Sequence, residues 1–372
     1  MPHPRPTSSP PPPRHRVRGA LKWLHLWLGL IVGTVFALVA LSGTVLTFQR
    51  EILLAQHPEW SRQPLPDTGT QARAFARLLA EWQPRGLRSA DIPSRRLPVW
   101  QAYFPDGERR YFDPASGELL LIRNADNDPV LWLRELHTHL LYGETGEDLL
   151  GACGLIAVFL LLSGLYLWWP RKGALAASLR WHAGPPTRRW LSWHRSTGAL
   201  LLPLLLLATV TGVAIVYHDA VRPALRWSFD DGPEPVPPLP LPRQPGTDID
   251  WAAVLQAAQA AVQGGELRRI SPPDEQDALV SIRYRAPGEW HPNGRSVVWL
   301  DPYAARAVQV HAATAQGLGA RIDEAMYPLH GGFIGGWPWQ WAVAASGLLP
   351  PFFLITGFLF WRARRRRTVT DP

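Results

Sequence analysis

The decapeptide LKWLHLWLGL at residues 21–30 places a histidine, His25, in the first turn of a long apolar run. The segment LSWHRSTGAL at residues 191–200 repeats this arrangement with His194. Each run is long enough to cross a hydrocarbon core of about 30 Å as a helix. We therefore expect an α-helical membrane protein that places metal-binding side chains at the membrane boundary.

Four such runs divide the 372 residues, and Lys and Arg cluster beside alternate ends of them. Because positive charge gathers on the cytoplasmic side, we predict a multi-pass bacterial inner-membrane protein with both termini in the cytoplasm. The predicted segments are a disordered basic tail (1–22), transmembrane helices (23–48, 149–170, 193–218 and 337–361), periplasmic modules (49–148 and 219–336), a cytoplasmic loop (171–192) and a basic tail (362–372).

Composition excludes several other classes of protein. The net charge is +8, but the basic residues flank the apolar runs, so we expect contact with membrane lipid and not with nucleic acid. The single cysteine, Cys153, allows neither an internal disulfide nor a covalent CxxCH haem attachment. No nucleotide-binding loop is present. The spans contain no Asp or Glu, which argues against an ion-coupled transporter.

The two halves of the chain align when His25 is laid over His194. The segments ELHTHLLYG and PLHGGFIGG then align as well, which sets His137 over His330. A repeat of this kind predicts two pseudo-symmetric halves, each with two membrane helices.

Each long outer segment carries an amphipathic helix, at 70–82 and 248–262, followed by strand-like runs. We expect two small α+β modules outside the membrane. The turn Asp113–Gly117 predicts a hairpin in the first module. In the second module we expect a longer turn after Asp301, with Arg306 in place of the glycine.

The repeated histidines are candidate haem ligands. Gly43 follows His25 by 18 residues, a whole number of helical turns, and therefore lies on the same face; Gly212 follows His194 in the same way. A histidine with small residues on its face leaves a slot for a flat ring, whereas an interfacial histidine that only contacts headgroups needs no such slot. We predict two b-type haems, one held by His25 and His194, the other by His137 and His330.

The outer pair leaves alternatives open. His139 lies two residues from His137, so only one of them can face the bundle; alignment of His139 with Gly332 favours His137. His218 is a further candidate. We expect the unpaired histidines, His57, His182, His291 and His311, to be solvated. In the second periplasmic module, Trp290, His291 and Arg295 could contact an anionic or aromatic ligand. They are equally compatible with an ordinary module surface.

As an ensemble, the motifs LHLWLGLIVG, LHTHLLYG, LSGLYLWWPRK, WHRSTGALL and ITGFLFWRARR, with YFDPASGELL between them, resemble the PepSY-associated transmembrane family across about residues 16–366. That resemblance implies an inner-membrane dihaem reductase with PepSY-like periplasmic modules, similar to ferric-siderophore reductases of the ferrioxamine-reductase kind. Its substrate would be a ferric siderophore, and the family's histidines correspond to His25, His137, His194 and His330.

Other functions fit parts of the sequence. A PepSY-type adaptor or peptidase regulator would need the spans only as anchors, and the duplicated histidines would have no role. A periplasmic electron acceptor other than a siderophore is also compatible with the sequence. Because no nucleotide site is present, the electron donor is expected to be a quinol or a cytoplasmic flavoprotein.

Overall fold

A computed structural model describes residues 13–62 and 64–370, which divide into two compact units. The helical unit gathers the residues up to Thr44, His137–Val216 and the residues from Val343 onward. The sheet unit gathers Val45–Leu136 and Tyr217–Ala342. Each unit therefore draws segments from both halves of the sequence.

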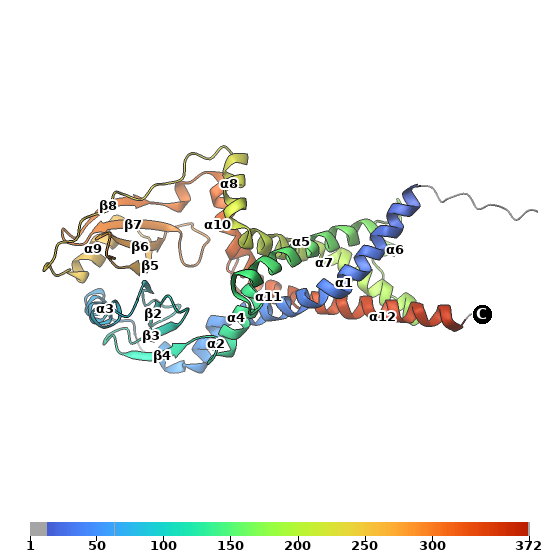
Figure 1. Cartoon of the computed structure of the whole chain (residues 1–372), viewed down its shortest axis with the longest axis horizontal. Helices are drawn as coiled ribbons and strands as arrows, with labels where there is room; N and C mark the ends of the chain where they lie inside the picture. Colours follow the sequence, from blue (N-terminus) through green and yellow to red (C-terminus); the bar gives the residue numbers. More distant parts are fainter. Residues whose placement is uncertain (1–12, 63, 371–372) are drawn as a thin grey trace, which may run out of the picture. The chain divides into compact units, whose positions relative to one another are not determined.

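Within the described residues, four helical stretches are long and apolar enough to cross a membrane: Arg16–Leu46, Gly143–Trp168, Pro186–Val216 and Trp337–Arg366. They confirm the four predicted spans. The helices are α1 (Pro13–Leu46), α5 (Gly143–Trp168), α7 (Pro186–Val216) and the pair α11 (Trp337–Ser346) and α12 (Leu349–Thr370) (Figure 1). Helix α7 packs against both α5 and α12.

The first helix starts earlier than predicted. Residues 13–22 belong to α1, although we expected a disordered tail over 1–22; residues 1–12 lie outside the described part of the chain. Pro13 stands at the first position of the helix, where its missing N–H costs no hydrogen bond. The residues that follow it suit a helix, which continues without a break into the span.

The fourth span is broken at Gly347 between α11 and α12, a feature that the sequence analysis missed. The Thr44 hydroxyl donates to the Ala344 carbonyl at 2.9 Å, so α1 lies directly against the break. A Cβ on Gly347 would stand within 2.4 Å of the Ala40 carbonyl oxygen. Only glycine allows this approach, and Pro350 and Pro351 then occupy the first turn of α12, where prolines are tolerated.

The strands of the described chain form one eight-stranded antiparallel sheet in the order β4-β3-β2-β1-β5-β6-β7-β8 (Figure 1). Its strands are β1 (Ser89–Asp91), β2 (Trp100–Tyr103), β3 (Arg109–Phe112), β4 (Leu119–Arg123), β5 (Glu266–Ser271), β6 (Val280–Arg285), β7 (Ser296–Asp301) and β8 (Arg306–His311). The helices of this unit are α2 (Gln49–Gln56), α3 (Thr68–Trp82), α4 (Pro129–His139), α8 (His218–Ser228), α9 (Trp251–Ala261) and α10 (Leu318–His330).

Helices α3 and α9 cover one face of the sheet. Asp67 and Asp250 cap them by accepting backbone N–H groups in the first turn. Their apolar faces, which include Phe75 of α3, enter one core with alternate strand residues such as Trp100 and Ile282. The opposite face carries the polar residues of the same strands.

The prediction of two separate modules differs from the structure. Each outer segment does contribute a helix and four strands, but β1 pairs with β5 through Ala90 and Ile270, so both contribute to a single sheet. These two joining strands were not predicted, because β1 has three residues and β5 contains the adjacent arginines Arg268 and Arg269.

The prediction for the second hairpin is wrong. Asp301 accepts the backbone N–H groups of Tyr303 and Ala304, as Asp113 accepts those of Ala115 and Ser116. The turn is as long as the first, and the residue at the glycine position is Ala305, with φ +46°, not Arg306. Arg306 begins β8 and pairs with Asp301.

Candidate functional site

The helical unit brings His25 of α1 and His194 of α7 together. Their ring centroids lie 6.2 Å apart and their planes meet at 81°, in an edge-on arrangement. The two residues are 169 positions apart in the sequence, so the bundle alone makes them neighbours. The geometry thus supplies a pair of imidazoles.

Hydroxyl groups fix the orientation and protonation of both rings. His25 Nδ1 lies 2.9 Å from Ser163 Oγ of α5, and that hydroxyl donates its own proton to the Leu160 carbonyl. Since the serine proton is already used, Nδ1–H must donate to Ser163 Oγ. The lone pair of His25 is therefore on Nε2, as a metal ligand requires.

The same argument holds for His194. Its Nδ1 lies 3.1 Å from Thr356 Oγ1 of α12, and the threonine hydroxyl donates to the Phe352 carbonyl at 2.8 Å. His194 Nδ1–H therefore donates to Thr356, which leaves Nε2 with the lone pair. Two neutral imidazoles with free Nε2 lone pairs are the donor set of a bis-histidine haem.

Glycines next to these hydroxyls give the rings room. A Cβ on Gly164 would stand 3.2 Å from His25 Cε1, and one on Gly357 would stand 3.5 Å from His194 Cε1. The slot differs from the prediction, which placed the glycines on the same helix as each histidine. Gly43, expected on the same helix face as His25, lies against His137 instead. Each small residue is supplied by the neighbouring helix.

His137 repeats the pattern against α1. Its Nδ1 lies 2.8 Å from the Val39 carbonyl oxygen, which can only accept, and 3.1 Å from Ser42 Oγ. A Cβ on Gly43 would stand 2.9 Å from His137 Cε1. Here too the proton is on Nδ1 and the lone pair on Nε2.

The alternative, His139, has different surroundings. Its Nδ1 meets the Thr138 hydroxyl at 2.7 Å, and its Nε2 lies 3.8 Å from a Glu147 carboxylate oxygen. Leu140 and Leu141, which follow it, both have positive φ, a strained conformation for leucine. The contacts favour His137 as the ligand.

His330 ends α10 in the sheet unit, whereas His137 belongs to the helical unit. The two outer candidates are thus described in separate units. His218, the other candidate, faces carboxylates with both nitrogens: Nε2 lies 3.4 Å from Asp323 and Nδ1 3.6 Å from Asp219. Neither nitrogen is presented as a free lone pair.

The expectation that the remaining histidines are solvated is wrong for His291. Its side chain is buried and stacks on Tyr327, with ring centroids 5.3 Å apart. Burial, reinforced by the positive charges of nearby arginines, lowers the pKa of His291 to about 3. His57 stacks on Trp60, His182 is partly buried, and His311 shares a hydrogen bond with Gln316.

The inner pair fits a haem iron. A metal between two imidazoles lies about 2 Å from each ring nitrogen, as in zinc sites, and each centroid lies about 1 Å further back, so the centroids are about 6 Å apart. The observed separation of 6.2 Å agrees. Among the described residues, no group of three His, Cys, Asp or Glu side chains gathers to hold a bare ion. A porphyrin supplies the other four nitrogens itself.

The sequence contained a signal for the hydroxyl partners. Every span contains a Ser-Gly or Thr-Gly dipeptide, and four of these dipeptides are Ser42-Gly43, Ser163-Gly164, Thr211-Gly212 and Thr356-Gly357. The glycines were recognised, but the hydroxyl that binds an imidazole on another helix was not. In three of the four dipeptides, hydroxyl and glycine face the same histidine ring.

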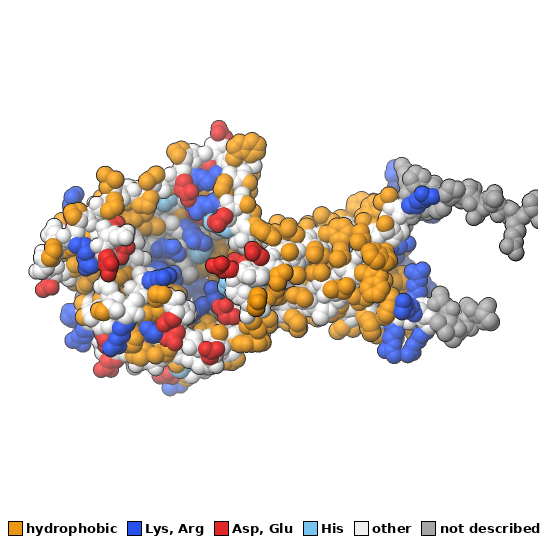
Figure 2. All heavy atoms as spheres, in the orientation of Figure 1, with side chains coloured by type: hydrophobic (Ala, Val, Ile, Leu, Met, Phe, Trp, Pro, Cys, Tyr) orange, Lys and Arg blue, Asp and Glu red, His pale blue; other side chains and the backbone are white. Residues whose placement is uncertain are grey.

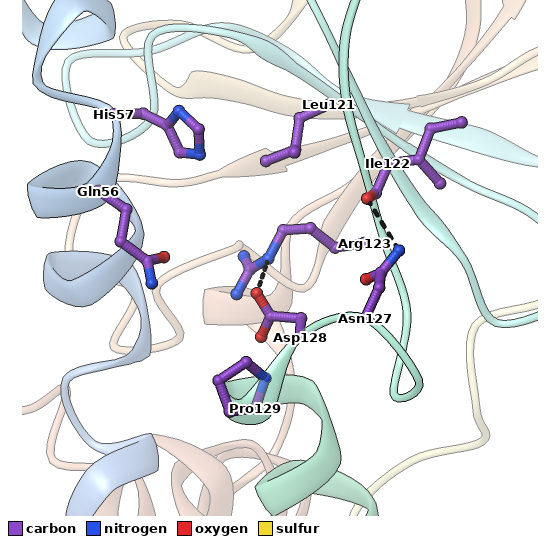
Figure 3. A pocket seen from close by; sticks show the side chains of 8 residues that line it. All are labelled: Gln56, His57, Leu121, Ile122, Arg123, Asn127, Asp128 and Pro129. Atoms are coloured by element: carbon purple, nitrogen blue, oxygen red, sulfur yellow. Dashed lines mark hydrogen bonds and ion pairs between the residues drawn. The ribbon is translucent and has the colours of Figure 1, made fainter.

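A hollow in the sheet unit is a weaker candidate. Figure 3 shows Arg123 paired with Asp128 beside His57, Leu121 and Asn127. The ion pair spans 2.7 Å and is buried, and Asp128 also caps α4 through the N–H groups of Val130 and Leu131. The charges of Arg123 and Asp128 are therefore used within the fold, and the hollow offers few groups that could bind a ligand.

Comparison with known proteins completes the description. The family model described as "PepSY-associated TM region" matches residues 22–364, nearly the whole chain. No curated protein matches the chain.

Proposed function

Because the chain belongs to the PepSY-associated transmembrane family, we propose that it is an inner-membrane oxidoreductase that passes electrons through two b-type haems. His25 and His194 would hold the first haem, and His137 and His330 the second. The observation that supports this most directly is the neutral imidazole pair with centroids 6.2 Å apart, each ring oriented by a hydroxyl.

The chain's own residues prepare this site. Ser163 and Thr356 hold the Nδ1 protons and so keep Nε2 unprotonated, while Gly164 and Gly357 keep the space beside each ring open. When bound, the iron of each haem supplies one-electron transfer. The apolar segments 23–48, 149–170, 193–218 and 337–361 contain no carboxylate that would compete for the imidazoles.

We propose that electrons enter from a quinol or a reduced flavoprotein on the cytoplasmic side and leave to a ferric siderophore in the periplasm. One-electron reduction of the ferric ion weakens its binding by hard oxygen ligands, so iron is released with the chelator intact. Lys and Arg gather at the end of the helical unit that carries the N-terminus of α1 and the C-terminus of α12, which supports the proposed cytoplasmic termini (Figure 2). At that end, Arg18 and Arg195 donate to the last carbonyls of α5.

A reduced-minus-oxidised absorption spectrum of the purified full chain tests the proposal. We expect a b-type spectrum, loss of one haem in His25→Ala or His194→Ala, and loss of the other in His137→Ala. His182→Ala, in the same unit, is the matched control and should keep both. A wild type that stayed colourless after expression and purification with haem supplied would contradict the proposal and favour an adaptor. Loss of a haem in His139→Ala but not in His137→Ala would overturn the outer ligand.

A further inference from the structure

The face of the sheet opposite α3 and α9 carries a cavity of about 420 Å³ within the sheet unit. We name it the arginine pocket, because nine arginines and only two carboxylates, Glu51 and Asp91, line it. Figure 2 shows basic side chains and a histidine collected in this hollow. The volume is in the range of sites for small molecules.

Strand register builds the floor of the pocket. Gln101, Asp91, Arg269 and Arg283 stand side by side on four adjacent strands, and their side chains share the open face. Asp91 pairs with Arg269 and accepts the Tyr103 hydroxyl at 2.7 Å. Arg269 also lies over the Tyr103 ring, 4.0 Å from its centroid. This network fixes the floor and uses up the Asp91 carboxylate.

Three arginines of the pocket, Arg109, Arg283 and Arg295, have no counter-charge among the described residues. Glu51 pairs with Arg50, so both carboxylates of the pocket are occupied. Among the described residues, no carboxylate lies within ion-pair distance of Arg109, Arg283 or Arg295. Three partly buried or exposed arginines thus line one cavity without a counter-charge from the part of the chain that the structure describes.

The pKa values of the pocket arginines reflect this crowding of positive charge. Burial and then neighbouring arginines lower the pKa of Arg96 to about 10 and also lower the pKa of Arg283. The folded protein therefore holds arginines close enough to repel one another, and this repulsion destabilises the fold. A bound anion would offset that repulsion.

Aromatic rings provide the rest of the wall. Tyr327 and Phe333 line the pocket, and each stands three residues from His330, the proposed outer haem ligand. His291, which is neutral, stacks on Tyr327. The pocket thus combines guanidinium forks, which match paired oxygens, with flat apolar surfaces, next in sequence to an electron-transfer ligand.

We propose that the arginine pocket binds the ferric chelate that this protein reduces, and that this chelate is a polyanion with carboxylate or catecholate oxygens. The assignment of a reducible chelate rests on the proposed function. A neutral or cationic tris-hydroxamate chelate would leave the guanidiniums unpaired and would bind weakly.

The test uses the full chain in neutral-lipid nanodiscs with gallium(III) chelates, which have the charge of ferric chelates but do not accept the electron. Calorimetry should show binding of a gallium tris-catecholate or gallium citrate at least about tenfold tighter than of a cationic gallium tris-hydroxamate. The affinity should fall as salt is raised. Equal affinities for the anionic and cationic chelates would overturn the proposal.

Variants connect the binding to the pocket. Arg283→Gln and Arg109→Gln should each weaken anionic-chelate binding by about tenfold or more, and Arg283→Lys should weaken it less. Arg306→Gln, which removes an exposed arginine of the same sheet outside the pocket, is the control and should bind as wild type. Unfolding midpoints of all the variants separate lost binding from lost folding. Equal binding by Arg283→Gln and Arg306→Gln would refute the assignment.

Two further arms fix the ligand class. Inorganic phosphate, or nanodiscs with anionic phosphatidylglycerol, should compete only weakly with the chelate; competition at equal affinity would make the pocket a general phosphate or headgroup site and overturn the proposal. The haem spectrum is recorded on the same sample. Tight binding by a colourless protein would refute the proposed reductase and leave a chelate-binding protein, so the two failures are distinguishable.

Discussion

The histidine pair of the helical unit and the arginine pocket of the sheet unit solve opposite electrostatic problems. Around His25 and His194, the polar groups are neutral, and each donor is matched by a hydroxyl or carbonyl acceptor. In the arginine pocket, like charges crowd together, and Arg109, Arg283 and Arg295 have no carboxylate within ion-pair distance among the described residues. The first arrangement suits a neutral ligand set in an apolar medium, and the second suits an anion that arrives from water.

This comparison predicts that the two sites can be removed separately. Gly164→Leu should displace the His25 ring, because even a Cβ there stands 3.2 Å from Cε1, and should abolish the inner haem. Gly19→Leu, at a helical glycine with nothing within 4 Å, is the control. Absorption spectra measure the haem, and gallium-chelate calorimetry should show unchanged anion binding in the same variant.

The reciprocal variant completes this test. Arg283→Gln should lose anion binding while the haem spectrum stays as in wild type. If Gly164→Leu lost both properties, or Arg283→Gln bleached the haem, the two sites would not be independent and the comparison would fail.

A smaller effect is expected from pH. In the unfolded chain, His291 takes up a proton when the pH falls below its usual pKa of 6.5. In the folded protein its pKa is about 3, so it stays neutral until about pH 3. Protonation in that window favours the unfolded chain, so the contribution of His291 to stability should fall as the pH is lowered from 6.5. Denaturant unfolding followed by tryptophan fluorescence measures stability at each pH, and His291→Gln should lose less stability than wild type when the pH is lowered from 6.5.

Glu324 has the opposite dependence. Burial and the nearby Glu289 raise its pKa from 4.5 to about 7, so the fold holds a proton there that the unfolded chain loses. Its contribution to stability is lost as the pH rises from 4.5 through 7. Glu324→Gln should remove this loss. If the wild type and both variants showed the same dependence of stability on pH from 3 to 7, both assignments would be contradicted.

The sequence was sufficient for the spans and for the His25–His194 pair, and the reasons are local. Apolar length marks a membrane helix without tertiary information, and a repeat with two histidines limits which side chains can pair. The hydroxyl partners required knowledge of helix crossing: Ser163 lies 138 residues from His25. The arginine pocket could not be predicted for the same reason. The pairing of β1 with β5 places Asp91 beside Arg269, and these strands come from distant segments of the sequence.

The smallest expected effect compares the two hairpins of the sheet. Gly117 and Ala305 occupy equivalent left-handed positions, with φ of +76° and +46°. Gly117→Ala should destabilise the protein by about 1–3 kcal/mol, because it adds backbone strain and its Cβ would stand 2.6 Å from the Ala74 carbonyl oxygen.

Ala305→Gly should stabilise by only about 0.5 kcal/mol. It relieves a left-handed alanine, which costs about 1–2 kcal/mol, but it gives back about 0.5–1 kcal/mol in the entropy of the unfolded chain. Denaturant midpoints measure both variants, and Ala304→Gly, one position earlier in the same turn, is the control and should destabilise slightly. A destabilised Ala305→Gly variant would show that Ala305 is not strained, and that the second hairpin differs from the first in conformation as well as in sequence.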